Sequence, residues 1–254
     1  MSLDHLVSVI TPVHNDTRYL RRVVESVAGQ TVAVLEHIIV DDGSHDETPE
    51  ILARLAQEFS GLVLIHQKRA GAAVARNRGI EAARGRYIAF LDADDVWHPR
   101  KVERQVRFME DRGVLFSFGD YLELDELGRH RQRQYRLPPV VGHRQLLRGC
   151  PIGCLTVAYN QEVLGKRYMP VVRSGHDWGL WLSLTREGIR AVKYPGLEAA
   201  YTNGKVSLSS RKLDKVRNVY RLYRETEGLS RARAAARTVQ HAAVAVAKKS
   251  GLIY

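Results

Sequence analysis

The stretch Tyr87-Ile-Ala-Phe-Leu-Asp-Ala-Asp-Asp95 decides the fold, because it joins a short apolar run to three closely spaced carboxylates. The run at residues 88–91 is too short for a helix and is bounded by polar residues, so it predicts a buried central strand. Pro99 suits the first position of a new helix, where its lack of an N–H costs nothing. We therefore expect the carboxylates at the C-terminal end of a buried strand, where ligands bind in open α/β sheets.

Acidic side chains as close together as Asp92, Asp94 and Asp95 repel one another unless a cation or hydrogen-bond donors offset their charge. A hard divalent ion held by one or two carboxylates and by substrate phosphates would offset it, so the stretch predicts a metal–diphosphate site. A solvated acidic loop is one alternative. A phosphatase-type Asp-x-Asp motif with Asp92 as nucleophile is another, although that chemistry usually needs a small hydroxyl residue where this chain has Asp95.

The composition of the 254-residue chain is that of an ordinary globular protein, with 44% hydrophobic and 26% charged residues. This length suits one large α/β domain, with or without a small appendage. No apolar run approaches the ~18 residues of a membrane span, and the N-terminus lacks a signal-peptide pattern, so we expect a cytoplasmic protein. Cys150 and Cys154 are too few ligands for a structural zinc site and are expected to be small buried residues.

The formal charge of +11 is concentrated at the C-terminal end of the chain. Residues 205–254 contain twelve Lys or Arg and three Asp or Glu, which leaves only +2 for all preceding residues. The basicity therefore describes a C-terminal extension and not the catalytic sheet. Such helices could contact anionic lipid at ~1 kcal/mol per basic residue, pack on their own domain, or contact a second subunit in a homodimer.

The first third of the chain alternates short apolar runs with segments of helical periodicity. Strands are predicted over residues 6–10, 35–40 and 62–65, ahead of the strand at 88–91. Asn15 or Asp16 can cap the first helix. Asp46 as the cap of the second helix places Pro49 inside the first turn, where it is tolerated, and the expected buried stripe is Ile51, Leu55 and Phe59. This alternation predicts βαβ units and a mostly parallel sheet with right-handed crossovers.

The rest of the chain is less regular. One or two strands are expected over residues 114–124, an exposed turn over 128–136 and a strand over 152–159. Further helices are predicted over residues 72–83, 101–111 and 177–185, the last with Trp178 and Trp181 in the core rather than stacked on a sugar. The C-terminal helices show two heptad-like apolar stripes, which are Leu213, Val216, Tyr220 and Tyr223 and then Leu229, Ala232, Ala236, Val239, Ala243 and Val246.

Acidic residues recur where strands end, with Asp42 after the second strand and Asp92, Asp94 and Asp95 after the fourth. The carboxyl ends of parallel strands lie along one edge, so these groups can share a site. The chain has no Gly-x-Gly-x-x-Gly motif and no Gly-x₄-Gly-Lys-Ser/Thr motif. The sequence therefore supports neither a dinucleotide-binding fold nor a P-loop. A metal ion and side chains must therefore bind any phosphate.

Six segments then occur in a characteristic order, and any one of them alone would be weak. They are Val9-Ile-Thr-Pro-Val-His-Asn15, Ile39-Val-Asp-Asp-Gly-Ser44, Ala75-Arg-Asn-Arg-Gly79, the stretch 87–95, His176-Asp177-Trp178 with Trp181-Leu182, and Tyr201 with Ser207-Leu208-Ser209. Together they resemble the signature of the family 2 glycosyltransferases with the GT-A fold. The resemblance covers most of residues 6–225. It implies a nucleotide-sugar-binding half at 1–112, an acceptor-binding and catalytic half at 113–204, and a basic helical extension at 205–254.

The resemblance assigns donor contacts to matching positions. Thr11, Pro12 and Asp42 match the residues that hold the nucleotide base, Asp42 by accepting a hydrogen bond from it. Arg76 matches a position that either reaches the nucleotide or forms a salt bridge on the helix surface.

The acidic stretch and the later motif match the metal site and the base. Asp92 matches the residue near the ribose or the metal, Asp94 the direct ligand of Mn²⁺ or Mg²⁺, and Asp95 a residue behind them. The metal is expected to neutralise the diphosphate leaving group. Asp177 matches the catalytic base of the inverting members, which takes the proton of the acceptor hydroxyl; its alternative role is a helix N-cap.

Two positions depart from the family pattern. The acid-acid pair of many members is His176-Asp177 here, so the neighbour of the proposed base is not an acid. The segment Tyr201-Thr-Asn-Gly-Lys-Val-Ser207 lacks the Arg and His that relatives often have after the Tyr. Lys205 is the candidate substitute as a counter-charge for the diphosphate.

The resemblance predicts an inverting glycosyltransferase that uses a nucleotide-sugar donor. It is closest to bacterial enzymes that build surface polysaccharides, whose acceptors are typically lipid-linked glycans at the cytoplasmic face of the plasma membrane. The alternatives are a non-catalytic nucleotide-sugar-binding relative and a nucleotidyltransferase, although the latter usually has a Gly-rich basic loop after the first strand. Nucleic-acid binding would explain the basic extension but not the acidic motifs, so no nucleic-acid partner is expected.

Overall fold

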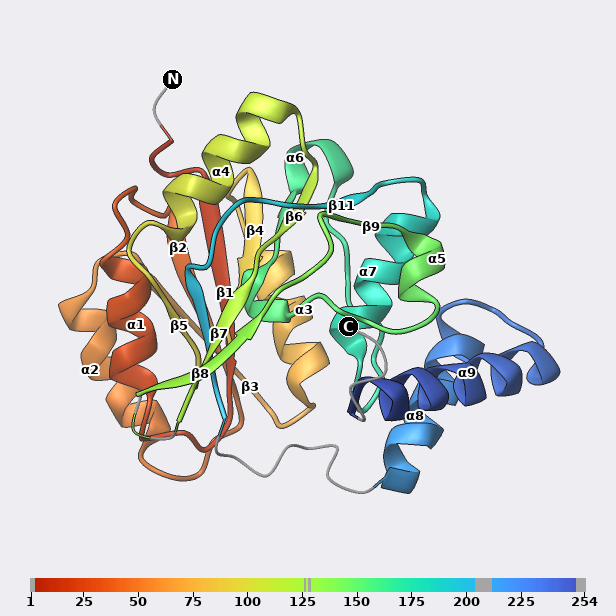
Figure 1. Cartoon of the computed structure of the whole chain (residues 1–254). Helices are drawn as coiled ribbons and strands as arrows, with labels where there is room; N and C mark the ends of the chain where they lie inside the picture. The colour runs from red at the N-terminus through yellow and green to blue at the C-terminus, as the bar shows by residue number, and fades with distance from the viewer. Residues whose placement is uncertain (1–2, 126, 128, 204–211, 250–254) are drawn as a thin grey trace.

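A computed structural model describes residues 3–125, 127, 129–203 and 212–249 of the chain (Figure 1). Its main sheet has the strand order β3-β2-β1-β4-β10-β6-β11-β9 among these residues. Four neighbouring strands run parallel, which are β1 (Val7–Val13), β2 (Glu36–Asp42), β3 (Leu62–Gln67) and β4 (Tyr87–Phe90). The stretch that decided the fold therefore supplies a fully buried strand in the middle of the sheet, as predicted.

The second half of the chain extends the same sheet beyond β4. The strand β10 (Ala158–Asn160) is antiparallel to both of its neighbours, β4 and β6 (Phe116–Phe118). Beyond β6 lie β11 (Ala191–Lys193) and the edge strand β9 (Val140–Val141). The strand expected over residues 152–159 is shorter, because a 3₁₀ turn occupies Cys154–Thr156. Cys154 is buried in this turn, whereas Cys150 is partly exposed, and both are free thiols.

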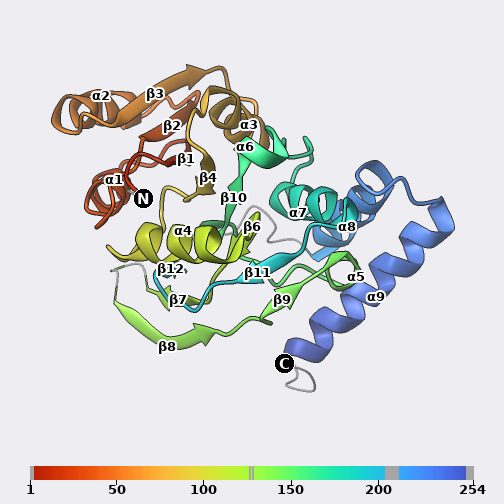
Figure 2. The ribbon, with the colours of Figure 1, turned by 90° about the horizontal axis from the view of Figure 1, so that it is seen from above.

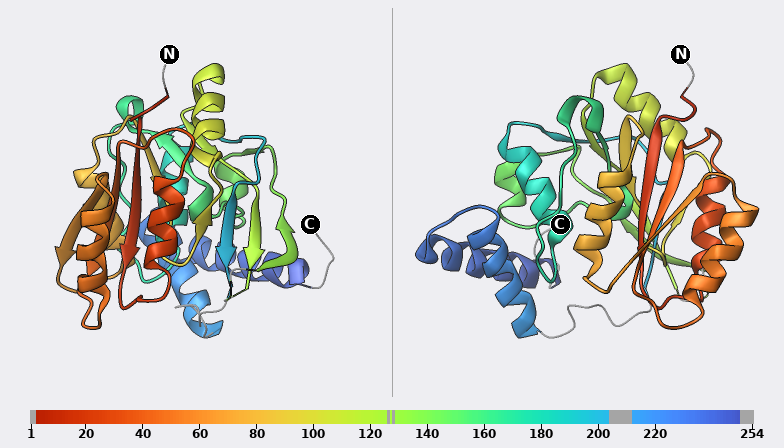
Figure 3. Two further views of the ribbon diagram at one scale, coloured as in Figure 1. Left: turned by 90° about the vertical axis from the view of Figure 1, so that its left-hand side faces the viewer. Right: turned by 180° about the vertical axis from the view of Figure 1, so that it is seen from behind.

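Helices cover both faces of the parallel strands (Figures 2 and 3). Along each strand, successive side chains point alternately to one helical layer and to the other. Ile10, Ile38 and their equivalents pack against α3 (Ala72–Ala82) and α7 (His176–Arg186). Val9, Ile39 and their equivalents pack against α1 (Leu20–Ala28), α2 (Thr48–Glu58) and α4 (Lys101–Arg112). Short helices α5 (His143–Leu146) and α6 (Gln161–Leu164) complete the layer of α7. Such two-sided burial requires the near-continuous apolar strands seen in the sequence.

A small second sheet lies beside the main one, with the order β5-β12-β7-β8. It contains β5 (Val96–Trp97), β12 (Ala199–Thr202), β7 (Tyr121–Leu124) and β8 (His130–Tyr135). Arg133 and Gln134 are exposed, as predicted for residues 128–136, but the expected turn was wrong, because β8 pairs antiparallel with β7 and Tyr135 stacks on Tyr121 at 4.4 Å. Edge strands commonly carry charged residues, so this polar strand gave no apolar signal.

The starts of the first two helices also differ from expectation. Helix α1 begins at Leu20 and not directly after Asn15 or Asp16. Asn15 instead has a left-handed backbone (φ 49°) and accepts the backbone N–H of His45, which ties the loop after β1 to the loop after β2. Helix α2 begins at Thr48, whose N–H donates to the Asp46 carboxylate. The buried residues of α2 are Thr48, Leu52 and Leu55, so the predicted stripe was displaced, with Ile51 and Phe59 only half-buried.

The extension forms two helices, α8 (Lys212–Glu225) and α9 (Arg231–Lys249), which pack beside α5 and α7 (Figure 2). Leu222 and Tyr223 of α8 are buried, and the His241 ring of α9 stacks on Trp178 at 5.1 Å. Along the heptad-like stripe of α9, Ala232, Ala236, Val239 and Ala243 are exposed, whereas the buried residues of this helix include Ala234 and Thr238. Alanine covers more than one face of this helix, so the periodicity did not define the packed side. Within the described residues no helix has both the length and the apolar character to cross a bilayer.

Candidate active site

The three predicted acids form a tight turn directly after β4. The Asp95 N–H donates to the Asp92 carbonyl over 3.1 Å, which closes the turn. The Asp95 carboxylate is buried and accepts the Thr202 N–H at the end of β12 over 2.9 Å. Burial and the neighbouring charges of Asp92 and Asp94 raise the pKa of Asp95 well above its usual range. Asp95 thus lies behind the other two acids and attaches the turn to the second sheet.

Arg22 of α1 supports this turn from one side, and sequence reasoning missed it. Its Nη2 donates to the Asp94 carbonyl over 2.5 Å and to Thr202 Oγ1 over 2.9 Å. Its guanidinium also lies over the Tyr19 ring at 4.6 Å. A cation at this point offsets part of the negative field of the acids. Its position in the sequence, beside Arg21, gave no signal of this role.

Arg76 of α3 supports the turn from the other side of the sheet. Its side chain is only 6% exposed, so the alternative of a salt bridge on the helix surface was wrong. Nη2 donates to Asp92 Oδ1, and Nη1 lies 2.6 Å from His176 Nε2. Burial alone would lower the pKa of Arg76, but Asp92 outweighs burial and raises it, so the guanidinium is permanently charged. Arg76 therefore joins the acid turn to the start of α7.

Asp177 lies in the first turn of α7 and is half-buried. The N-cap of α7 is Gly175, in a left-handed conformation (φ 77°), so the alternative role of Asp177 as a helix cap does not apply. Trp178 and Trp181 are buried, as predicted, and Trp178 Nε1 donates to the Leu146 carbonyl over 3.0 Å. The core thus fixes the helix that presents Asp177.

Asp42 is buried at the end of β2, where it organises the loop after β3. Its carboxylate accepts Gln67 Nε2 (2.7 Å), the Ala70 N–H (2.7 Å) and the Gly71 N–H (2.8 Å). The next residue, Gly43, has φ +68°, and a Cβ there would lie 2.7 Å from the Arg69 backbone nitrogen, so only glycine permits this approach. A carboxylate has about four acceptor sites, which leaves room for the predicted donor from a nucleotide base.

The remaining predicted site residues are Thr11, Pro12 and Lys205. Thr11 is buried and its Oγ1 lies 2.9 Å from His37 Nε2, so any contact of Thr11 with a base would have to use its backbone. Pro12 is half-buried at the end of β1. Lys205 lies outside the described residues.

Asp92 and Asp94 are the candidate protein ligands for a divalent ion. No group of three or more His, Cys, Asp or Glu that could hold a metal occurs within the described ranges. Asp92 and Asp94 alone would provide two carboxylates, which fits an ion of the Mg²⁺ or Mn²⁺ type that takes its other ligands from substrate phosphates and water. Three carboxylates within four residues repel one another, and such an ion would offset part of their charge.

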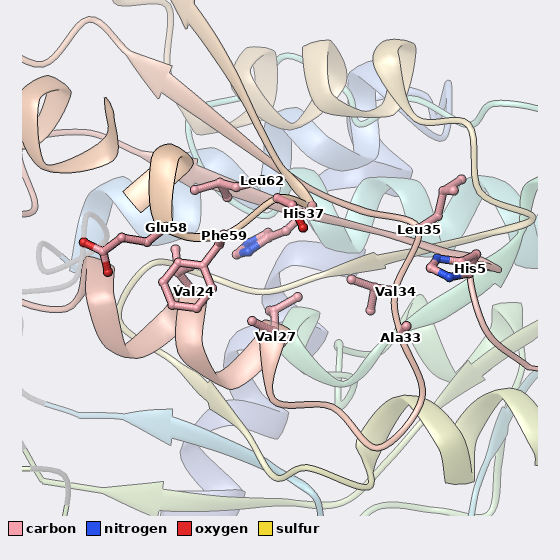
Figure 4. Close-up of a pocket in the computed structure, with 13 residues that line it drawn as sticks. His5, Val24, Val27, Ala33, Val34, Leu35, His37, Glu58, Phe59 and Leu62 are labelled. Carbon is pink, nitrogen blue, oxygen red and sulfur yellow. The ribbon is translucent and has the colours of Figure 1, made fainter. Parts of the chain in front are cut away.

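A cavity of about 470 Å³ lies at the opposite end of the strands (Figure 4). Its walls come from the last turns of α1 and α2 and from the starts of β2 and β3, and they include Val24, Phe59 and Leu62. Buried His37 also lines it, but none of the candidate site residues does. It is therefore separate from the acidic site.

Comparison with known proteins gives a consistent result. The family described as "Glycosyl transferase family 2" matches residues 8–166. The putative teichuronic acid biosynthesis glycosyltransferase TuaG of Bacillus subtilis is 38% identical over 245 residues, which cover 96% of this chain and 97% of TuaG. The UDP-Glc:alpha-D-GlcNAc-diphosphoundecaprenol beta-1,3-glucosyltransferase WfgD of Escherichia coli is 32% identical over 215 residues, covering 84% and 83% of the two chains.

A solved structure shares the fold. The mannosyltransferase PcManGT from Pyrobaculum calidifontis, in complex with GDP-Man and Mn²⁺, superposes with a TM-score of 0.65 at 19% identity. The match covers 95% of this chain and 75% of PcManGT. At this identity the likeness concerns the fold alone.

Proposed function

From the premise that the chain belongs to glycosyl transferase family 2, we propose that it transfers a sugar from a nucleotide-diphospho-sugar to a lipid-linked glycan intermediate in cell-surface polysaccharide synthesis. The protein is a glycosyltransferase with the GT-A fold. The assignment of individual residues to this reaction is our proposal.

One observation supports the site more than any other. Arg76 contacts Asp92 through one nitrogen and His176 through another, and His176 is the neighbour of Asp177. The acid turn and the candidate base are more than eighty residues apart in the sequence, yet a single buried guanidinium connects them. A transferase needs this juxtaposition, because the base must lie near the carbon from which the diphosphate departs.

The proposed donor site uses the carboxyl edge of the sheet. Asp42 accepts an N–H of the base, and the backbone of Thr11 with Pro12 lies against it. Asp94 with Asp92 would hold Mn²⁺ or Mg²⁺, which when bound neutralises charge on the diphosphate. Asp95 holds these acids in place through Thr202.

Lys205 is the proposed further counter-charge for the diphosphate. In the transfer step, Asp177 takes the proton of the acceptor hydroxyl while the hydroxyl oxygen attacks the anomeric carbon. The bond from that carbon to the diphosphate breaks on the opposite face, so the configuration inverts and the nucleoside diphosphate leaves with the bonding electrons. Arg76, beside Asp92, contributes fixed positive charge near the leaving group.

The acceptor is proposed by analogy with relatives of similar length. TuaG is named for teichuronic acid biosynthesis and WfgD for a diphosphoundecaprenol-linked GlcNAc acceptor. A lipid-linked acceptor would place this protein at the cytoplasmic face of a membrane. The exposed face of α9 (Ala232, Ala236, Val239 and Ala243), with Arg231 and Arg233 also exposed, suits shallow contact with anionic lipid. Self-association through the same face would produce a homodimer, which light scattering would detect.

The proposal is tested by nucleotide binding and transfer. Thermal unfolding should shift upward with one of UDP, GDP, CDP or dTDP in the presence of Mn²⁺, since a ligand at ~100 times its Kd adds about 2.7 kcal/mol. Asp94→Asn should abolish the metal-dependent part of this shift. Asp177→Asn should keep the shift and stop sugar transfer to a lipid-linked acceptor.

Two outcomes would contradict the proposal. A folded wild-type protein that responds to no nucleoside diphosphate, with or without Mn²⁺, would contradict the proposed donor site. Loss of nucleotide binding and transfer to the same extent in Asp177→Asn would remove Asp177 from the role of base.

A further inference from the structure

The residue before the proposed base is a histidine with an unusual partner. His176 is the first residue of α7, and its Nε2 lies 2.6 Å from Nη1 of Arg76. The other ring nitrogen, Nδ1, is buried, and the ring also interacts with the backbone of Val172. The family resemblance gives no account of this contact, because it concerns an acid at the position.

Elementary chemistry fixes the roles in this contact. A guanidinium can only donate hydrogen bonds, so His176 Nε2 must accept and the proton of the neutral ring must be on Nδ1. Burial and then the charge of Arg76 lower the pKa of His176, which favours the neutral ring. Protonated His176 would instead place two donors against each other.

We propose that His176 is a positioning residue that, as a neutral acceptor, holds the Arg76 guanidinium between Asp92 and the first turn of α7, and so fixes Asp177 relative to the donor. This inference rests on the proposed function of that site. His176 itself need not touch the substrate.

The surrounding structure makes the contact a rigid link. Asn77, the neighbour of Arg76, exchanges two hydrogen bonds of 2.8 Å with the backbone of Met169 ahead of α7. Gly179 lies so close to Pro170 that an added Cβ would be 2.3 Å from its Cγ, so α7 and the preceding segment are closely packed. Helix α3 and the start of α7 therefore share one frame, and the Arg76–His176 contact transmits the position of Asp92 to Asp177.

A neutral acceptor also differs from an acid in its electrostatic effect. Asp92 and Asp177 both contribute to the charge around Arg76. A carboxylate at position 176 would compete with Asp92 for the guanidinium, whereas the imidazole holds it without adding an anion.

The test compares two substitutions of His176 in the full chain. His176→Gln keeps an acceptor that Arg76 can use and should keep kcat within about 3-fold of wild type. His176→Leu leaves a buried guanidinium N–H unpaired and should lower kcat by about 10- to 100-fold, as expected for loss of a charged hydrogen bond. The KM for the donor and the Mn²⁺-dependent affinity for the nucleoside diphosphate should change little. Equal kcat in both variants, or parallel losses of kcat and nucleotide affinity, would overturn the inference.

A double-mutant cycle with Arg76→Lys separates positioning from general damage. If the two residues act as a pair, His176→Leu should add little to the loss caused by Arg76→Lys. Losses that multiply would show that the two side chains act independently. The unfolding midpoints of all variants show whether a loss of kcat reflects a failure to fold. If His176→Leu does not fold, His176→Gln is compared with wild type instead.

A spectroscopic measurement needs no activity. Nitrogen-15 NMR of the labelled histidines, with His176→Gln to identify the signal among the ten histidines of the chain, should show a neutral ring protonated at Nδ1. A ring protonated at Nε2, or on both nitrogens at neutral pH, would overturn the proposed contact. If the tautomer is as expected but the wild-type protein transfers no sugar, the proposed function fails while the contact stands.

Discussion

Acid should destabilise this protein through His37, a buried histidine in the parallel sheet. His37 is 4% exposed in β2, its Nε2 is hydrogen-bonded to Thr11 Oγ1 at 2.9 Å, and its Nδ1 has no hydrogen-bond partner among the described residues. Burial lowers the pKa of His37 from its ordinary 6.5 to about 3. The folded protein therefore keeps His37 neutral over a pH range in which the unfolded chain protonates it.

His37 couples the free energy of unfolding to pH, because the folded and unfolded states bind protons differently at this residue. The unfolded state binds the extra proton, so the contribution of His37 is complete above pH 6.5 and is lost as the pH falls from 6.5 toward 3. The slope approaches ~1.4 kcal/mol per pH unit, so the free energy of unfolding should fall by about 2 kcal/mol between pH 7.5 and pH 5 from this residue alone.

The assay is urea unfolding at both pH values, followed by circular dichroism. His37→Gln cannot titrate, so its loss of stability between pH 7.5 and 5 should be smaller than that of wild type by about 2 kcal/mol, whatever its absolute stability. A pH dependence of His37→Gln equal to that of wild type would refute the reasoning.

Two further predictions concern the frame around the site. Asp42→Asn replaces a carboxylate oxygen that accepts a backbone N–H by an amide donor, so urea unfolding should show a loss of about 1.5–3 kcal/mol and calorimetry a weaker affinity for the nucleoside diphosphate. The exposed control Asp46→Asn, which keeps a side-chain oxygen that can accept the Thr48 N–H, should change neither quantity. Gly79→Ala would place a Cβ 2.5 Å from Ile10 Cγ2 and should cost about 1–3 kcal/mol by overpacking in thermal unfolding. Gly61→Ala, with nothing within 4 Å of the added Cβ, should have almost no effect, and equal melting temperatures for the two would contradict the packing argument.

The parallel half of the fold could be predicted from the sequence because its strands are buried on both faces. β1 and β4 are short, nearly continuous apolar runs and β2 has an apolar centre at residues 38–40, and polar or acidic residues lie at or after the C-terminal end of each strand. That pattern places Asp42 and the acids 92–95 at one edge before any coordinates are known. The prediction was weaker for β8, because an edge strand of polar residues has no apolar pattern, and for α9, because alanine covers several of its faces.

The contacts that organise the site could not be predicted, because they join residues far apart in the chain. Arg22 reaches Thr202 across 180 positions, and Arg76 reaches His176 across 100. Local periodicity carries no information about such pairs. The inward orientation of Thr11 likewise depends on His37, on a neighbouring strand, and was not expected from the motif that contains Thr11.

Two arginines from the helical layers on opposite faces of the sheet contact the acid turn, and they donate to different kinds of oxygen. Arg22, from the layer of α1, donates to the carbonyl of Asp94 and thereby fixes the backbone of the turn. Arg76, from the layer of α3, donates to the carboxylate of Asp92 and so neutralises part of its charge permanently. A divalent ion would therefore meet an Asp92 that already shares one oxygen with a guanidinium. In the proposed site this arrangement favours Asp94 as the direct ligand, and Arg76 would keep a fixed positive charge beside the leaving group whether or not a metal is bound.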